Sequence, residues 1–499
     1  MTRVTFSHIS PARAAVDLLL LPVFEDGDAG DDVRSIGEAL GADLHSVMDR
    51  NGVRPQLGST CLIPTLGRIP ATAVLLLGLG RRAELDGLGL RRAIMKAAPE
   101  LSRYRRVATT LHTSVANDGV DVDAAVHAAA EAVALAGYRY PADRSAAAHP
   151  QTLTFLDGAR RSRSTSRAAE HGRVHADAAN RARELVDAPA GEATPEEVAA
   201  RLKRMAAEVG VRCSVLAVPE LRRRGFGAIL GVGASSVNQP RLVVLRYEGG
   251  GRAPLVAIAG KGITFDAGGL MLKDATELPD MKVDMAGGAA VAAAVRAAAE
   301  LRLPVNLVAA IPLAENLPSA TAIHPGDVIR HPNGTTTEVW DTDGEGRLVL
   351  ADALAFLAAQ RPAAIVDLAT LTSAAEHALG LDLWAVIGND DGLVRSLLKA
   401  GEQEGEPGWQ LPLWVGYREH LVSRVADRRN TGASYREGGA ILGALFLREF
   451  VGDIPWAHID MAGPTWADHR GGLTEWPRGA TGSPARTIMR WLEGWGDRS

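Results

Sequence analysis

The first third of the chain alternates short apolar runs with longer helical patterns. Short apolar runs bounded by turn residues are typical of buried strands, whereas a helix needs a longer run with a repeating apolar face. The segments that fit a strand are 17–24, 72–77 and 152–156, and those that fit a helix are 33–50 and 124–137. We therefore predict an α/β domain over residues 1–156.

Residues 157–190 differ in character from the segments on either side. Arg160, Arg161, Arg163 and Arg167 lie among serines, a composition typical of a solvated linker. A helix is expected from about 174 to 186, before Pro189. We predict that this segment is a basic linker with a connecting helix.

The second predicted domain, 191–499, opens with a helix start. Thr194 can cap a helix over 195–209, Pro195 suits its first position, and Glu197 can close a capping box. Apolar runs at 211–216, 241–247, 255–259, 305–311 and 364–368 then alternate with helical patterns at 286–299 and 347–359. This alternation predicts a mixed, mostly parallel central sheet flanked by helices. Sites in such sheets lie at the carboxyl ends of strands, so we expect one in the glycine-rich loop 260–269.

The composition adds few constraints. The 499 residues allow two or three domains, and a net charge of −5 gives no sign of a polyanionic partner. Two cysteines, Cys61 and Cys213, form no disulfide framework and fit a reducing compartment. The start of the chain has no secretory pattern, and no uncharged apolar run reaches about 18 residues. We expect a cytoplasmic protein that does not enter a membrane.

The stretch from 261 to 347 gathers charged residues among glycines, in an otherwise apolar, alanine-rich half. Its candidate residues are Lys261, Asp266, Lys273, Asp284, Asp343, Glu345 and Arg347. Buried carboxylates are costly unless a cation pairs with them. Two divalent metal ions would do so, and they could also make hydroxide from water and polarise a carbonyl group.

Each acidic residue also has an ordinary structural interpretation. Asp343 and Glu345 would share a face in an extended segment, but they could equally form a polar turn before a helix over 348–357. Asp266 could be a turn residue, and Asp284 could cap the helix that follows it. Residue by residue, these alternatives stay open.

The basic residues and the histidines have alternatives too. Lys261 either reaches solvent or is a neutral metal ligand, and Lys273 is by default a surface lysine. Four histidines show no ligand spacing and are expected to be structural: His324, His331, His458 and His469. Residues 78–83 match a dinucleotide-binding loop loosely, without an acidic residue at the expected distance.

Taken together, the ordered segments resemble the leucyl aminopeptidase family of two-metal cytosolic aminopeptidases. The family hallmark is Asn-Thr-Asp-Ala-Glu-Gly-Arg-Leu, and residues 341–348 read Asp-Thr-Asp-Gly-Glu-Gly-Arg-Leu. Segments 260–269, 281–285, 315–318, 325–328, 369–372, 456–463 and 479–482 also match. The resemblance covers roughly 175–490 and implies a macro-like N-terminal α/β domain before a catalytic domain.

The resemblance implies a site for two divalent ions, Mn²⁺ or Zn²⁺. One ion is expected on Lys261, Asp266, Asp284 and Glu345, and a more exchangeable one on Asp266, Asp343 and Glu345. A hydroxide between the ions is expected to attack the first peptide carbonyl, with Lys273 stabilising the oxyanion. Arg347 is expected to hold a bicarbonate ion that acts as general base.

The resemblance also implies the partners. The substrate is a peptide whose free α-amino group binds a metal and Asp284, with further contacts from Met281, Thr370, Leu371 and Ser373. The protein is expected to form a homohexamer. We expect it to bind neither nucleic acid nor a membrane.

Four positions depart from the family pattern. Asp341 replaces Asn, Gly344 replaces Ala, Ala267 replaces a common Ser, and Ser373 stands where Gly is usual. They leave metal preference and substrate specificity open. The alternatives are a narrow dipeptidase of the Cys-Gly type, a tailoring enzyme for one peptide, and a DNA-binding or scaffold protein, for which the basic segment is the only support.

Overall fold

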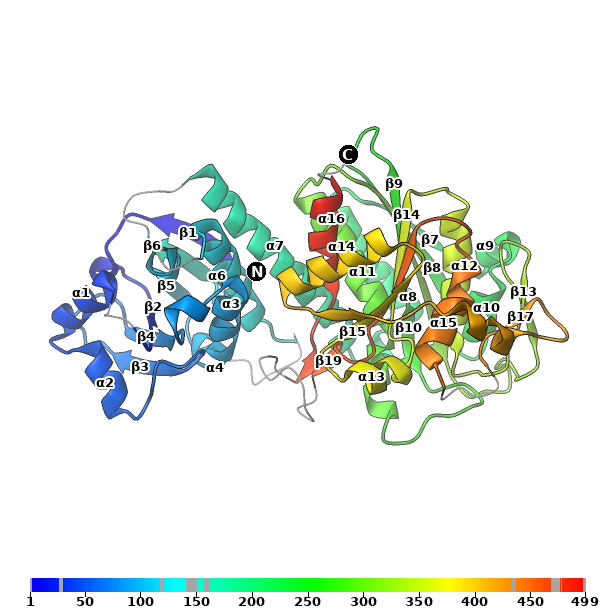
Figure 1. Ribbon diagram of the computed structural model, residues 1–499, viewed down its shortest axis with the longest axis horizontal. Helices are drawn as coiled ribbons and strands as arrows, with labels where there is room; N and C mark the ends of the chain where they lie inside the picture. Colours follow the sequence, from blue (N-terminus) through cyan, green and yellow to red (C-terminus); the bar gives the residue numbers. More distant parts are fainter. Residues whose placement is uncertain are drawn as a thin grey trace. The chain divides into compact units, whose positions relative to one another are not determined.

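The computed structural model describes residues 2–26, 30–116, 120–140, 150–156, 162–432, 437–467, 476 and 478–496. The chain divides into two compact units, Met1–Asn180 and Arg181–Ser499. Each unit has its own sheet with helices around it (Figure 1), so the predicted α/β fold class is confirmed. Among the described residues, no helix combines the length and apolar character that a membrane crossing requires.

The first unit is built on a six-stranded sheet with the order β1-β6-β5-β2-β4-β3. Its strands are β1 (Arg3–Ser7), β2 (Leu18–Val23), β3 (Thr60–Pro64), β4 (Ala73–Gly78), β5 (Arg106–Thr109) and β6 (Thr152–Leu156). Its helices include α1 (Asp31–Leu40), α2 (Leu44–Arg50), α3 (Gly87–Lys96), α4 (Ala98–Leu101), α5 (Leu111–Ser114) and α6 (Val122–Ala136). Of these six strands, β3 alone pairs antiparallel to its neighbour. Strands β2 and β4 are buried at every position, as their uninterrupted apolar runs predict.

Two helical predictions for this half were wrong in extent. The segment 33–50 forms two helices, because Gly41 ends α1 with a positive φ of 69° and Asp43 caps α2. The supposed linker from 163 onward belongs to helix α7 (Arg163–Asp187). Ser162 Oγ accepts a hydrogen bond from Thr165 N at 2.9 Å, so a serine interpreted as part of a linker caps this helix. Arg160 and Arg161 lie outside the described residues.

The second unit contains a nine-stranded sheet with the order β16-β15-β18-β14-β9-β11-β8-β7, and β10 pairs with β11. Its strands are β7 (Arg212–Leu216), β8 (Arg241–Glu248), β9 (Leu255–Gly260), β10 (Gly262–Asp266), β11 (Asn306–Asn316), β14 (Ala364–Ala369), β15 (Trp384–Gly388), β16 (Gly408–Gln410) and β18 (Trp456–Asp460). The four central strands β18, β14, β9 and β11 run parallel, while β8, β7 and β15 add antiparallel pairs. The mixed, mostly parallel sheet is therefore confirmed.

The other described elements of the second unit include helices and a small separate sheet. The helices include α8 (Pro195–Ala207), α9 (Val218–Arg224), α10 (Gly227–Gly233), η5 (Leu278–Met285), α11 (Ala286–Glu300), α12 (Glu345–Ala358), α13 (Ser373–Leu379), α14 (Asp391–Glu404), α15 (Gly439–Arg448) and α16 (Ala485–Gly496). The strands β12 (Val328–Arg330), β13 (Thr336–Glu338) and β17 (Arg428–Arg429) form the small sheet. Thr194 caps α8 as predicted, but the Glu197 carboxylate pairs with Arg201 and Arg204.

Strand β10 occupies half of the predicted loop 260–269. Strand β11 continues to Asn316, past its predicted end at 311, and its extension gives β10 a parallel edge on which to pair. The two strands approach closely at Gly262, where a Cβ would lie 2.6 Å from the Pro312 carbonyl oxygen. Glycine is needed there because the two backbones approach too closely for a side chain.

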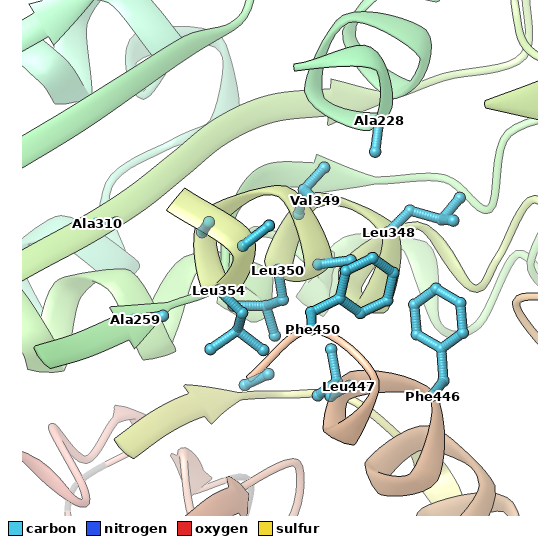
Figure 2. Packing of buried hydrophobic residues seen from close by; sticks show 14 of the residues in the cluster. Ala228, Ala259, Ala310, Leu348, Val349, Leu350, Leu354, Phe446, Leu447 and Phe450 are labelled. Carbon is cyan, nitrogen blue, oxygen red and sulfur yellow. The ribbon is translucent and has the colours of Figure 1, made fainter. Parts of the chain in front are cut away.

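Helix α12 is anchored in the core of the second unit. Leu348, Val349, Leu350 and Leu354 on this helix pack among side chains of α15 and the sheet (Figure 2). Because a close-packed interior holds side chains in fixed positions, the first turn of α12 is also fixed. Glu345 and Arg347 lie in that turn.

Candidate metal centre

Elements from distant parts of the second unit bring the charged residues together. Lys261 follows β9, Asp266 ends β10, and Glu345 is the first residue of α12. Asp284 lies in η5, immediately before α11. The site therefore forms where parallel strands end, at the edge of the sheet where the sequence predicted it.

Lys261 is buried among acceptors and does not reach solvent. Its side chain is 4% exposed, and its Nζ lies 2.8 Å from both Asp284 Oδ1 and Glu345 Oε1. The same nitrogen donates a hydrogen bond to the Thr370 carbonyl oxygen at 3.0 Å. This arrangement excludes the solvated alternative for Lys261. It also excludes the capping alternative for Asp284, whose carboxylate faces this lysine and the Thr370 hydroxyl.

Lys273 lies inside the cluster, so its default interpretation as a surface residue was wrong. Its Nζ is 2.9 Å from Asp266 Oδ2 and forms a second ion pair with Asp343. One carboxylate oxygen each from Asp266, Asp343 and Glu345 lie within 4.8 Å of one another. Four carboxylates thus share two ammonium groups, which leaves the cluster with excess negative charge.

Several oxygen atoms of the cluster are buried without a hydrogen bond. Among the described residues, Glu345 Oε2 and Asp284 Oδ2 have no hydrogen-bond partner. Buried carboxylate oxygens are almost always satisfied, so each such atom needs an explanation. A divalent cation is the natural partner of oxygen atoms placed this way, and the donor set fits Mn²⁺, Zn²⁺ or Mg²⁺.

The pKa values of the charged residues in the cluster are shifted by the same excess of negative charge. Burial, reinforced by Asp266 and Glu345, raises the pKa of Asp284 well above its ordinary value although Lys261 opposes the shift. Burial and the same two neighbours raise the pKa of Asp343 to about 8. Burial opposes the charge of both lysines, yet the surrounding carboxylates raise the pKa of each. A bound dication would stabilise the ionised carboxylates and reverse these shifts.

Glycines make the close approach of these groups possible. A Cβ on Gly346 would lie 2.5 Å from Lys261 Cε, so the lysine passes directly over this position. Gly268 has a φ of +87°, and a Cβ there would lie 2.4 Å from the Met271 carbonyl oxygen.

Asp343 and Glu345 do not lie on an extended segment, so the prediction that they share one face of such a segment was wrong. Helix α12 begins at Glu345, so Glu345 and Arg347 are helical and Asp343 lies in the preceding turn. Glu345 is fully buried, whereas the Asp343 side chain is 36% exposed. The acids converge because the turn and the helix start meet at the cluster.

Arg347 is buried near the cluster with part of its guanidinium unsatisfied. Its Nη1 donates to the Asn430 carbonyl oxygen at 2.9 Å, and its Nε has no partner among the described residues. Burial lowers the pKa of this arginine, while Asp341 and Glu345 oppose the shift. The unsatisfied part of this guanidinium can pair with a small anion.

The four expected substrate-contact residues lie on two segments beside the cluster. Thr370 is buried and donates its hydroxyl to Asp284 Oδ1 at 2.7 Å. Leu371 and Met281 are half-buried, and Met281 belongs to η5 with Asp284. Ser373 is exposed and opens α13.

Three of the four histidines considered in the sequence analysis are described by the structure. His331 and His458 are fully buried and pair with Asp352 and Asp367 at 2.7 and 2.6 Å. His324 is exposed, 3.4 Å from Asp327. All three lie outside the metal cluster, while His469 lies outside the described residues.

Three supporting residues were missed from the sequence. Asn316 donates to Asp266 Oδ1 at 2.8 Å and to the Thr342 carbonyl oxygen at 3.0 Å. Asp460 accepts from Leu371 N at 3.1 Å and from the Thr372 hydroxyl. Asn430 contacts the segment before α12. Asn316 and Asp460 end strands of the sheet, so their position was a usable signal, whereas Asn430 offered none.

Two family models match the chain. Residues 180–489 match the cytosol aminopeptidase family, catalytic domain, and residues 20–146 match the cytosol aminopeptidase family, N-terminal domain. Together the two matches span most of the chain.

Individual relatives match over nearly their whole length. The chain is 42% identical over 487 residues to a probable cytosol aminopeptidase of Syntrophotalea carbinolica, covering 96% of this chain and 97% of that protein. It is 38% identical to a probable cytosol aminopeptidase of Streptomyces coelicolor, covering 99% and 98%.

Solved structures share the fold as well. The bottromycin maturation enzyme BotP in complex with Mn is 36% identical, with a TM-score of 0.86 over 97% of this chain and 100% of that one. A mutant of tomato leucine aminopeptidase is 28% identical, with a TM-score of 0.84 over 99% and 97%.

Proposed function

The chain belongs to the cytosol aminopeptidase family and is a metal-dependent aminopeptidase, and from this premise we propose that it releases an apolar N-terminal residue from peptides. The observation that carries the proposal is the buried cluster around Lys261. Its four carboxylates exceed its two ammonium groups, and oxygens of Glu345 and Asp284 are left without hydrogen bonds.

We assign the metal ligands as the family resemblance implies. Lys261, Asp266, Asp284 and Glu345 would hold one divalent ion, and Asp266, Asp343 and Glu345 the more exchangeable one. Mn²⁺ and Zn²⁺ both suit this set of oxygens with a single lysine nitrogen. Lys261 fits because its Nζ already lies between two of the assigned carboxylates.

The bound ions would supply a nucleophile from water at neutral pH and polarise the scissile carbonyl. The protein's own groups then account for the remaining tasks. Lys273 carries a positive charge beside Asp266 and Asp343, where it can stabilise the negative oxygen that develops on the carbonyl. Arg347, with its unsatisfied Nε, would hold bicarbonate as the group that accepts a proton.

Recognition of the free α-amino group is assigned to Asp284. Its Oδ1 contacts Lys261 and the Thr370 hydroxyl, but its Oδ2 has no hydrogen-bond partner among the described residues. That oxygen can accept a hydrogen bond from the substrate amine. A peptide without a free amine would lose this hydrogen bond to the ligand carboxylate, which costs binding energy.

The preference for an apolar first residue can be measured with a small panel of peptides. Met281 and Leu371 are half-buried apolar side chains on the segments that carry Asp284 and Thr370. Since a missing methylene in an apolar pocket costs roughly tenfold or more, kcat/KM for Leu-Gly-Gly should exceed that for Gly-Gly-Gly by at least about tenfold. Equal values for the two peptides would reject the apolar preference.

A narrower role, the processing of one particular peptide, is the second candidate. The similarity to the bottromycin maturation enzyme favours it over a Cys-Gly dipeptidase or a DNA-binding protein, because that relative is named for the maturation of one product. Adding Cys-Gly to the same panel separates these functions. Rapid cleavage of Cys-Gly alone would indicate a dipeptidase, and slow cleavage of every short peptide would indicate a dedicated substrate.

Assembly and location complete the proposal. We propose a cytoplasmic homohexamer, as the family resemblance implies. A DNA-binding role would depend on the basic segment, of which Arg163 and Arg167 belong to helix α7. No contact among the described residues favours such a role.

A further inference from the structure

Asn430 joins two parts of the catalytic site through one buried side chain. Its exposed fraction is 0%, and its Oδ1 accepts hydrogen bonds from Trp340 N at 2.8 Å and Asp341 N at 3.2 Å. Its Nδ2 donates to the Asp341 carbonyl oxygen at 2.6 Å and to the Gly344 carbonyl oxygen at 3.4 Å. One amide therefore satisfies backbone groups on both sides of Asp343.

Asp343 depends on such support more than the other assigned ligands do. Lys261, Asp266 and Glu345 lie at the ends of strands or on a buried helix. Residues 341–344, in contrast, belong to no helix or strand. Where no regular backbone hydrogen bonds hold a segment, side-chain hydrogen bonds must fix its conformation.

The backbone of Asn430 holds the other part of the site. Its carbonyl oxygen accepts the 2.9 Å hydrogen bond from Arg347 Nη1, and its N–H donates to the Glu338 carbonyl oxygen at 3.1 Å. The residue follows strand β17, which pairs in parallel with β13. The position of Asn430 is thus set by a small sheet, and two site residues take their position from it.

Gly344 leaves room for the amide. A Cβ at this position would lie 2.8 Å from Asn430 Nδ2, closer than such contacts normally come. Gly344, which replaces the Ala of the family hallmark, therefore lies directly against Asn430.

We propose that Asn430 is a positioning residue that fixes the Asp343 segment and the Arg347 guanidinium relative to each other. This inference rests on the proposed function, in which Asp343 holds the exchangeable ion and Arg347 the anion. Without the amide, the turn before α12 would sample other conformations, and the exchangeable ion would lose a preorganised ligand. The tightly held ion, whose ligands lie on regular elements, would be little affected.

Asn430→Ala is the test variant, and Asn306→Ala is its matched control. Asn306 also clamps a loop, accepting from Gly250 N at 3.1 Å and donating to the Gly251 and Ala253 carbonyl oxygens at 3.2 and 2.7 Å. It lies at the opposite end of β11 from Asn316. A general effect of losing a loop clamp would therefore appear in both variants.

The experiment strips each full-length protein of metal and titrates Mn²⁺ by calorimetry, with kcat and KM measured at limiting and saturating Mn²⁺. We expect two ions per subunit in the unmodified protein and in Asn306→Ala. In Asn430→Ala the weaker site should lose about 10–100-fold in affinity, the usual cost of removing a ligand's support, while the tighter site is unchanged. Its kcat should fall most at limiting Mn²⁺ and recover in part at saturation.

The outcomes separate this inference from the proposed function. Fewer than two ions in the unmodified protein would reject the proposed function. Two ions in that protein, with the same two affinities in Asn430→Ala, would reject the role of Asn430 alone. If Asn430→Ala does not fold, Asn430→Ser, whose hydroxyl is too short to bridge the same groups, gives the same comparison.

Discussion

Replacing Lys273 with alanine is expected to lower kcat by roughly a hundred- to thousandfold, the usual effect of losing one group that stabilises a developing oxyanion. The ammonium group lies between Asp266 and Asp343, at the open side of the cluster. In the ground state it does little beyond neutralising these carboxylates. Its removal should therefore change kcat much more than KM.

The metal content distinguishes this effect from damage to the site. Lys273 competes with a cation for the same two carboxylates, so Lys273→Ala should bind Mn²⁺ at least as tightly as the unmodified protein. Lys203→Ala, an exposed lysine on α8, serves as the control. Steady-state kinetics with calorimetric Mn²⁺ titration test the prediction, and an unchanged kcat in Lys273→Ala would reject the assigned role.

Glu345→Gln is expected to abolish metal-dependent activity, with a loss larger than the roughly 10–100-fold that removal of a supporting group costs. Glu345 is fully buried and is the one carboxylate in contact with Lys261 that is assigned to both ions. An amide of the same shape keeps the packing of α12 but offers a neutral oxygen. The variant should fold normally and bind the ions poorly.

Thermal unfolding gives this prediction a second readout. Burial and Asp266 raise the pKa of Glu345, so the ionised carboxylate is unfavourable without metal. The metal-free variant should therefore be as stable as the metal-free unmodified protein, or more stable. Mn²⁺ at a hundred times its Kd should stabilise the unmodified protein by about 2.7 kcal/mol for each ion bound, and the variant by much less.

The control is Glu402→Gln, an exposed position on α14. It should keep the full Mn²⁺-dependent rise in Tm. A rise of the same size in Glu345→Gln would mean that the ions bind elsewhere.

The strands and most helices could be predicted because their apolar runs carry the information locally. Strands β2 and β4 are buried at every position and stand out as uninterrupted apolar segments, and β14 is also fully buried although Asp367 interrupts its apolar run. The break between α1 and α2 was missed because it depends on one left-handed glycine, Gly41, inside an otherwise helical pattern. Strand β10 was missed because it exists only where the extension of β11 offers an edge.

The candidate site could be located from the sequence, but its support could not. The charged residues between 261 and 347 marked the carboxyl ends of strands, and the ordered family motifs favoured one ligand assignment where single residues had left the choice open. The contacts of Asn430 with residues 340–347 join segments more than eighty positions apart in the sequence. No local pattern carries such a contact.

The structure shows the surroundings of the residues that differ from the family pattern. Asp341 Oδ1 accepts a hydrogen bond from Asp343 N at 2.9 Å, which an asparagine oxygen could also do. The added negative charge instead opposes the lowered pKa of Arg347. Ser373 begins α13 at an exposed position, and nothing in its surroundings explains the replacement of glycine.

The most direct measurement compares release of leucine from Leu-Gly-Gly with that from N-acetyl-Leu-Gly-Gly, using protein loaded with Mn²⁺ and the same protein stripped of metal. A two-metal aminopeptidase that recognises the free amine through Asp284 should cleave only the free peptide, and only when loaded. Equal cleavage of both peptides, or full activity of the stripped protein, would contradict the assignment of this cluster as a metal site for amino-terminal hydrolysis.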